Sequence, residues 1–239
     1  MTTWIGILAP MPNELRPVVR ALGLRRDGEL GGAPRYRGVV GGAEVVATGT
    51  GIGPPLAAAA TARLLADHAP DHVLVSGIAG GVEGASGVGD LVVPAEVVDG
   101  ATGDRFRAAP VDGVAAAGTI RTGDVDSYRL TDDELQALRA EGVVALDMET
   151  AAVARACEER GVPWSAFRGI SDMAGDPSVG EEVMTLVHAD GSPDLRAATR
   201  FLLRHPRRIP RMVRLGRDAG AAASLAARAA ADAVARLAA

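Results

Sequence analysis

Three acidic residues stand where their side chains could transfer protons or hold hydroxyl groups. Glu149 follows the apolar run 143–146, and Asp172 follows the apolar run 164–170. A third acid, Glu14, comes just after a short apolar run at the start of the chain. In open α/β sheets, ligands bind in the crevice at the carboxyl ends of the strands. The spacing therefore predicts a pocket with carboxylates on its floor.

A plainer interpretation exists for each acid taken alone. Glu14 and Glu149 each fall in or next to a predicted first helical turn, where the helix dipole favours an acid, and Asp172 could cap a turn. Two acids in one strand–helix–strand unit, with a third near the first strand, favour a functional site instead.

The elements that position these acids follow from apolar periodicity and from glycine and proline punctuation. Residues 143–172 predict a βαβ unit whose helix ends near Arg160, before Gly161 and Pro163. Asn13 is the expected N-cap of a helix over 14–22. Further strands are expected at 4–9, 35–40, 44–48, 72–76, 89–98 and 117–122, further helices at 54–67 and 131–140, a loop at 102–114, and helical structure over about the last 45 residues.

Two glycine-rich segments are expected near the pocket. Residues 48–55, TGTGIGPP, form a strand-to-helix turn whose backbone N–H groups would suit an anion or a ribose. The segment is neither the GxGxxG dinucleotide motif nor a P-loop. Residues 77–81, GIAGG, are small enough to let a ligand approach the backbone closely.

The composition excludes several classes of protein. A chain of 239 residues, 48% of them hydrophobic, suits one large α/β domain, and the net charge of −5 gives no footprint for nucleic acid. All 25 basic residues are Arg, so a catalytic lysine is excluded. The four histidines lack metal-ligand spacing, and no GxSxG motif is present. The single Cys157, expected to be a packing residue, and the absence of a signal peptide or an apolar stretch of membrane-spanning length predict a cytoplasmic protein.

Several motifs together resemble the nucleoside phosphorylase/nucleosidase superfamily, and most nearly its 5′-methylthioadenosine/S-adenosylhomocysteine nucleosidases. They are IGILAPMPNEL, GTGIGPPLAAAATARLL, VSGIAGGVEGASGVGDLVVP, ALDMETAAVA and VPWSAFRGISD, and they cover residues 4 to about 176. The resemblance implies a three-layer α/β/α fold with a mixed, twisted central sheet. It also implies cleavage of the N-glycosidic bond of a purine nucleoside, without cofactor or metal.

The resemblance also implies roles for individual residues. Asp172 would protonate or hydrogen-bond purine N7, and an acid there implies adenine rather than hypoxanthine as the leaving base. Glu149 would hold the ribose hydroxyls, Met148 would pack against the sugar, and Glu14 would activate the attacking water. Further substrate contacts are expected at Ile78, Ala79, Gly80 and Ser171.

Water or phosphate as the nucleophile is a separate question. The phosphorylases that this chain resembles hold phosphate with arginines and with a Ser or Thr in the glycine run. Ile78 stands at that position and cannot hydrogen-bond phosphate through its side chain. Hydrolysis is therefore favoured, and a phosphorylase with an anion site built around Arg16 and loop arginines is the alternative.

Two departures from the nucleosidase pattern concern the substrate. Where the resembling enzymes carry an aromatic that stacks on adenine, this chain has Asp126, with Tyr128 two residues later. The second departure is a longer tail. We expect a catalytic domain over residues 1–194 and an Arg/Ala-rich helical extension of it over 195–239.

Residues 200–217, RFLLRHPRRIPRMVRLGR, hold seven Arg and no acid. The favoured interpretation is a basic face docked on an acidic body, and the alternative is contact with an anionic membrane surface or a lipid-linked substrate. The tail also resembles the hopanoid-associated phosphorylase branch, which implies an adenosylated lipid as the alternative substrate. A non-catalytic nucleoside-binding protein is less favoured because all three acids are present. By the same resemblance, a homodimer is expected.

Overall fold

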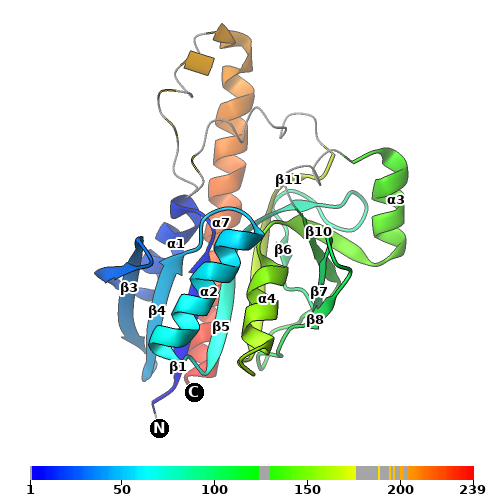
Figure 1. The fold of residues 1–239 in the computed structure, drawn as a ribbon. Helices are drawn as coiled ribbons and strands as arrows, with labels where there is room; N and C mark the ends of the chain where they lie inside the picture. Colours follow the sequence, from blue (N-terminus) through cyan, green and yellow to red (C-terminus); the bar gives the residue numbers. More distant parts are fainter. Residues whose placement is uncertain are drawn as a thin grey trace.

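The computed structural model describes residues 2–123 and 130–175, the single residues 188, 194, 196, 200 and 201, and residues 204–239 (Figure 1). The strands are β1 (Trp4–Ala9), β2 (Arg25–Leu30), β3 (Ala33–Val40), β4 (Ala43–Gly49), β5 (His72–Gly81), β6 (Leu91–Val92), β7 (Glu96–Asp99), β8 (Arg105–Arg107), β9 (Thr119–Thr122), β10 (Val143–Asp147) and β11 (Trp164–Met173). The helices are α1 (Pro12–Leu22), α2 (Pro54–His68), α3 (Asp132–Ala140), α4 (Thr150–Glu158), the short 3₁₀ turn η3 (Pro206–Arg208) and α7 (Ile209–Leu237).

The described strands form one mixed sheet of eleven strands. Along the main path the order is β2-β3-β4-β1-β5-β10-β9-β7-β8, and β11 pairs with β5 and β6. Strands β4, β1, β5 and β11 run parallel, whereas β2, β3 and β4 form antiparallel pairs. The mixed sheet expected from the resemblance is confirmed.

Helices cover both faces of this sheet (Figure 1). On one face, α2 and α4 pack against each other and bury side chains such as Leu64 and Val153 in a core with β5. On the other face, α1 and α7 pack together and bury Val18 and Ala230 against β1 and β4. The protein is therefore a three-layer α/β/α structure. Within the described residues, no helix is long and apolar enough to cross a bilayer.

Strand β5 shares one of its edges between two partners, and this creates the gap in which the candidate site lies. β1 pairs with β5 at residues 72–75, and β10 pairs with it only at Gly80 and Gly81. The other edge of β5 is covered by β11 over residues 73–81. Between the ends of β1 and β10, the backbone of residues 76–79 therefore faces side chains instead of another strand.

The prediction that residues 143–172 form a βαβ unit is only partly right. β10, α4 and β11 all form, but β10 and β11 do not pair with each other. They lie on opposite edges of β5, and β10 runs antiparallel to it. Gly80 lies opposite Leu146 of β10 and Asp172 of β11, so the two strands still end at the same place.

Other predicted boundaries shift for local reasons. Helix α1 begins at Pro12 with Met11 as its N-cap, so the prediction of Asn13 was wrong. β5 continues through the glycine run to Gly81, because residues 76–81 pair with β11. The strand expected at 89–98 is divided into β6 and β7 around Pro94, which has no backbone N–H for a ladder. The segment expected to be a loop at 102–114 contains β8, and β2 was not predicted.

The C-terminal half of α7 lies unusually close to the sheet. Its buried face is made almost entirely of alanine, from Ala222 to Val234. A Cβ built on Gly169 of β11 would lie 2.2 Å from the carbonyl oxygen of Ala222. Only small residues on both elements permit this approach.

We therefore predict that Gly169→Ala lowers the free energy of unfolding by about 1–3 kcal/mol, the usual cost of overpacking a core. Urea unfolding of the purified variant measures this. Gly220→Ala is the matched control, because nothing lies within 4 Å of a Cβ at this position of α7. That change should leave stability unchanged or raise it by up to about 1 kcal/mol through helix propensity. Equal stability of the two variants would contradict the close packing.

Candidate active site

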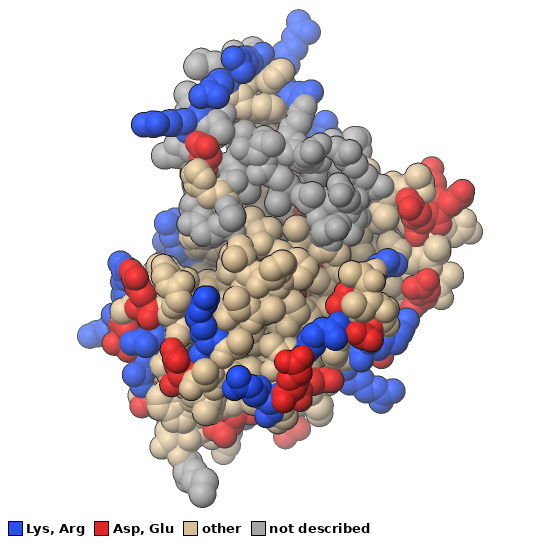
Figure 2. All heavy atoms as spheres, viewed as in Figure 1, with Lys and Arg blue, Asp and Glu red and all other residues tan. Residues whose placement is uncertain are grey.

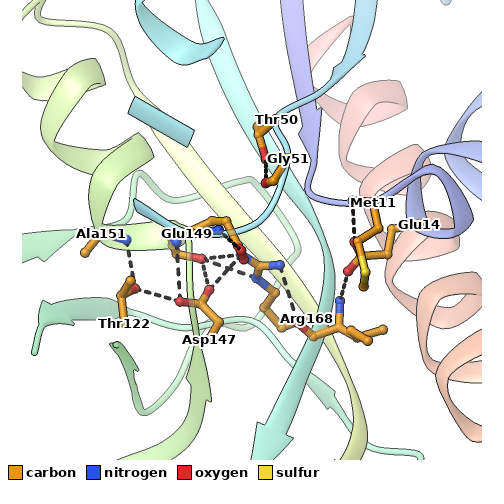
Figure 3. Close-up of polar contacts among 12 residues, drawn as sticks. Met11, Glu14, Thr50, Gly51, Thr122, Asp147, Glu149, Ala151 and Arg168 are labelled. Atoms are coloured by element: carbon orange, nitrogen blue, oxygen red, sulfur yellow. Dashed lines mark hydrogen bonds and ion pairs between the residues drawn. The ribbon is translucent and has the colours of Figure 1, made fainter. Parts of the chain in front are cut away.

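Glu14 projects from the first turn of α1 into the gap along β5. Its Oε2 accepts a hydrogen bond from the backbone N–H of Met11 (2.7 Å), and its Oε1 accepts one from the N–H of Ile78 (2.7 Å) (Figure 3). The side chain is only 1% exposed. Burial raises the pKa of Glu14 to about 7, although nearby Arg168 and the two backbone hydrogen bonds act in the opposite direction. The carboxyl group thus titrates near neutral pH.

Arg168 of β11 links Glu14 to the other acids. It lies opposite Gly77 of β5, and its Nη1 donates a hydrogen bond to the carbonyl oxygen of Ile78 (3.4 Å). A Cβ on Gly77 would lie 2.5 Å from Arg168 Nη1 and 2.6 Å from Glu14 Oε1. Gly77 is therefore the residue that lets the guanidinium and the carboxylate approach the same point on β5.

Asp147 and Glu149 lie on the far side of this guanidinium. Arg168 Nη2 is 2.7 Å from Asp147 Oδ2 and 3.5 Å from Glu149 Oε2, and its guanidinium also donates to the hydroxyl of Thr150 (Figure 3). Asp147 Oδ1 accepts a hydrogen bond from Thr122 Oγ1 (2.6 Å). The Arg168 side chain is fully buried and that of Asp147 nearly so. Such a pair persists only when its remaining hydrogen-bonding groups are satisfied, as they are here.

Glu149 also binds the glycine-rich turn. The N–H of Gly53, just before α2, donates to Glu149 Oε1 (2.9 Å). Burial raises the pKa of Glu149 to about 8, while Arg168 acts in the opposite direction and Asp147 adds to the rise. One N–H of the turn that was expected to face an anion or a ribose is thus occupied by a carboxylate of the protein.

Asp172 reaches the same edge of the sheet through an irregularity in β11. The pairing with β5 passes from Ile170–Ala79 to Asp172–Gly80, so Ser171 is an extra residue in a β-bulge. Bulges turn side chains away from the regular alternation and are common beside active sites. The hydroxyl of Ser171 donates to Asp172 Oδ1.

The structure brings most of the predicted residues to this edge. Ala79 and Gly80 are buried in β5, Ile78 contributes its backbone, and half-buried Met148 lies between Asp147 and Glu149. Asp126 and Tyr128 lie outside the described residues.

Neither Arg168 nor Asp147 was predicted to be a site residue. One indication was present, because Arg168 is the only charged residue in the apolar run 164–170. A charge in a buried strand requires a partner, so its position signals a buried ionic cluster.

Two other chemistries find little support in the described ranges. Among these residues, no group of three or more His, Cys, Asp or Glu could hold a metal ion. Cys157 is buried on α4, and burial raises the pKa of its thiol to about 12, so the reactive thiolate is disfavoured. Glu14 and Glu149, whose pKa values burial raises to about 7 and about 8, are the carboxyls of this cluster that can exchange protons near neutral pH.

Comparison with known proteins places this site in context. The sequence profile described as the Phosphorylase superfamily matches residues 5–128 and 113–204. The 5′-methylthioadenosine/S-adenosylhomocysteine nucleosidase of Aeromonas salmonicida is 31% identical over 205 residues, covering 73% of this chain and 88% of that protein. The enzyme of the same description from Tolumonas auensis is 29% identical, covering 79% of this chain and 95% of that protein.

Solved structures show the same fold. The 5′-methylthioadenosine/S-adenosylhomocysteine nucleosidase of Neisseria meningitidis, in complex with methylthio-immucillin-A, superposes with a TM-score of 0.72 at 22% identity, covering 98% of this chain and 99% of that one. The futalosine hydrolase of Helicobacter pylori superposes with a TM-score of 0.73 at 21% identity, covering 98% of both chains.

Proposed function

This chain belongs to the phosphorylase superfamily, and we propose that it hydrolyses the N-glycosidic bond of 5′-substituted adenosines, such as 5′-methylthioadenosine and S-adenosylhomocysteine, and releases adenine. The observation that carries the proposal is the buried Glu14 carboxyl, anchored on the Ile78 N–H beside Arg168 and Glu149. The named relatives support the substrate class.

In this proposal Glu14 is the general base. A pKa of about 7 leaves a substantial ionised fraction at neutral pH and still gives useful basicity, the compromise that favours proton transfer. Glu14 takes a proton from water as the water oxygen bonds to C1′ of the ribose. The two backbone N–H groups hold the carboxylate in one orientation, which lowers the entropic cost of that step.

Asp172 is the general acid. As the bond from C1′ to N9 breaks, the electron pair moves into the purine, and a proton delivered at N7 lets adenine leave neutral. Two features orient this carboxyl at the strand end: the bulge at Ser171, and the hydrogen bond that the Ser171 hydroxyl donates to Asp172. Proton transfer of this kind contributes typically ~10²–10⁴ in rate.

Glu149 stabilises the sugar, and Met148 packs against it. Positive charge develops on the ribose in the transition state and favours the ionised form of a nearby carboxyl, so it lowers the pKa that burial has raised. The attraction therefore grows as the reaction proceeds, which is the condition for catalysis rather than mere binding. Arg168 positions the carboxyls of Asp147 and Glu149. Its positive charge also offsets part of the negative charge that these two acids and Glu14 would carry when ionised.

The proposal predicts that adenine is released from 5′-methylthioadenosine at the same rate with and without inorganic phosphate, with free 5-methylthioribose as the sugar product. Chromatography of both products measures this. The Ile78 side chain cannot form a hydrogen bond with phosphate, and its backbone N–H already binds Glu14. Residue 78 therefore offers phosphate no free donor. Strict dependence on phosphate, with a 1-phosphate sugar as product, would establish the alternative phosphorylase.

Absence of release under both conditions would favour a bulkier 5′ group, such as that of an adenosylated lipid. We also propose that Asp172 acts at purine N7, that residues 195–239 form an extension of the catalytic domain, and that the protein is a homodimer. Tight binding of a nucleoside without any turnover would favour the binding-protein alternative.

A further inference from the structure

The described run of the basic segment 200–217, residues 204–217, projects away from the body of the protein (Figure 1). The first half of α7 extends away from the sheet, beyond the edge at which β1, β5 and β11 end (Figure 1). Figure 2 shows Arg side chains gathered on this projection, with the acidic side chains of the visible face mostly on the body. The first buried residue of α7 is Ala222, and residues 207–211 are exposed.

The charges of the chain are strongly separated. The segment holds seven Arg and no acid, and removing these seven charges from the net charge of −5 leaves −12 on the rest. From Ala222 back to Ile209 the helix extends roughly 20 Å at 1.5 Å per residue. Because the Debye length is about 8 Å in physiological salt, the end of the projection is largely screened from the acidic body. It can therefore approach an anionic surface that the body would be repelled by.

Exposed apolar side chains accompany the arginines. Ile209 is 40% exposed and Val213 is 57% exposed, and they lie four residues apart, on the same side of the helix. On the helical wheel Arg217 lies beside this pair, about 40° from Val213, and Arg214 lies farther round on the same side. Aliphatic side chains gain little from nucleic-acid bases, which favour aromatic stacking and hydrogen bonds, but they gain by entering the acyl region of a bilayer.

From this geometry we propose that the described residues 204–217 form a docking surface for an anionic lipid membrane. The arginines contact the lipid headgroups, and Ile209 and Val213 enter the boundary with the acyl chains. Glu14 follows the end of β1, and Asp172 lies near the end of β11. Because the projection extends beyond these strand ends, docking turns the candidate active site toward the bilayer (Figure 1). The inference is independent of the reaction proposed above.

The test uses the full chain, because α7 also supplies Ala226 and Val234 to the core and cannot be deleted cleanly. We expect the protein to sediment with vesicles containing phosphatidylglycerol and not with vesicles of phosphatidylcholine alone. Raising the salt concentration should release it, since the attraction is electrostatic. Equal binding to both kinds of vesicle, or to neither, would overturn the proposal.

Charge-matched variants locate the surface. A variant with Arg207, Arg214 and Arg217 changed to Gln should bind roughly 100-fold more weakly, from ~1 kcal/mol per basic residue near an anionic surface. The control changes the exposed Arg25, Arg107 and Arg160 of the body to Gln, which alters the net charge equally. Equal losses in the two variants would show that net charge acts without a docking surface.

Insertion is tested separately with Val213→Trp. Its emission, after subtraction of the wild-type signal of Trp4 and Trp164, should shift to shorter wavelength with anionic vesicles and be quenched by brominated lipid. A soluble polyanion, such as RNA, should produce neither change. The same response with RNA as with vesicles would identify a polyanion site instead and overturn the membrane proposal. Adenine release from a soluble nucleoside, assayed on the same variants, keeps this result distinct from a failure of the proposed reaction.

Discussion

Asp172→Asn should lower kcat for adenine release from 5′-methylthioadenosine by about 10²–10⁴, the usual contribution of a general acid. An amide has nearly the same shape and can still accept the hydrogen bond from Ser171, but it has no proton to deliver to N7. The loss should depend on the leaving group. A nitrophenyl riboside, whose leaving group departs as a stable anion without protonation, should be cleaved by the variant at close to its wild-type rate.

The comparison of these two substrates distinguishes a loss of catalysis from a loss of folding. A misfolded variant would lose both substrates equally, whereas loss of the acid affects only the one that needs a proton. Asp112→Asn is the matched control, because Asp112 is exposed and its contact with Arg236 uses its backbone oxygen and not its carboxylate. Near-normal release of adenine by Asp172→Asn would remove the acid assignment.

Glu14→Gln should lower kcat/KM by about 10²–10⁴ for both of these substrates, because the attacking water is common to them. The pH profile should change as well. In the wild type, the ionised fraction of Glu14 falls tenfold for each pH unit below its pKa of about 7, so kcat/KM should fall with the same slope as pH decreases. Above pH 7 the base is ionised and this limb levels off.

In Glu14→Gln this acidic limb should disappear and leave a low rate that depends little on pH between about 5 and 7. Glu141→Gln, at the exposed end of α3, is the control and should keep both the rate and the limb. If the acidic limb persisted unchanged in Glu14→Gln, another group would be the base. Glu149, whose pKa burial also raises, would then be the first candidate.

Local patterns in the sequence were sufficient for most elements of the fold. The helix expected over 131–140 forms as α3. Thr131 and Glu134 make both hydrogen bonds of a capping box at its start. The strands expected at 35–40 and 44–48 form as β3 and β4, and the helix expected after the glycine-rich turn forms as α2. These features depend on residues close in sequence, so one segment carries all the information.

Strand pairing, and contacts between side chains far apart in the sequence, could not be predicted from such local patterns. Nothing within residues 143–172 indicates that β10 and β11 take opposite edges of β5, because that choice depends on where β1 stops. The contact of Glu14 with Ile78 joins residues 64 positions apart, and that of Glu149 with Gly53 joins residues 96 apart. The sequence predicted that the acids would meet, but not the guanidinium that holds them together.

Ile78 holds two charged side chains of the site through its backbone alone. The N–H of Ile78 binds Glu14 and its carbonyl oxygen binds Arg168, and neither contact uses the side chain. In evolutionary terms, the residue type at this position can vary while the carboxylate and the guanidinium stay anchored. A single substitution at this position can therefore change the side chain that faces the pocket without removing either backbone contact.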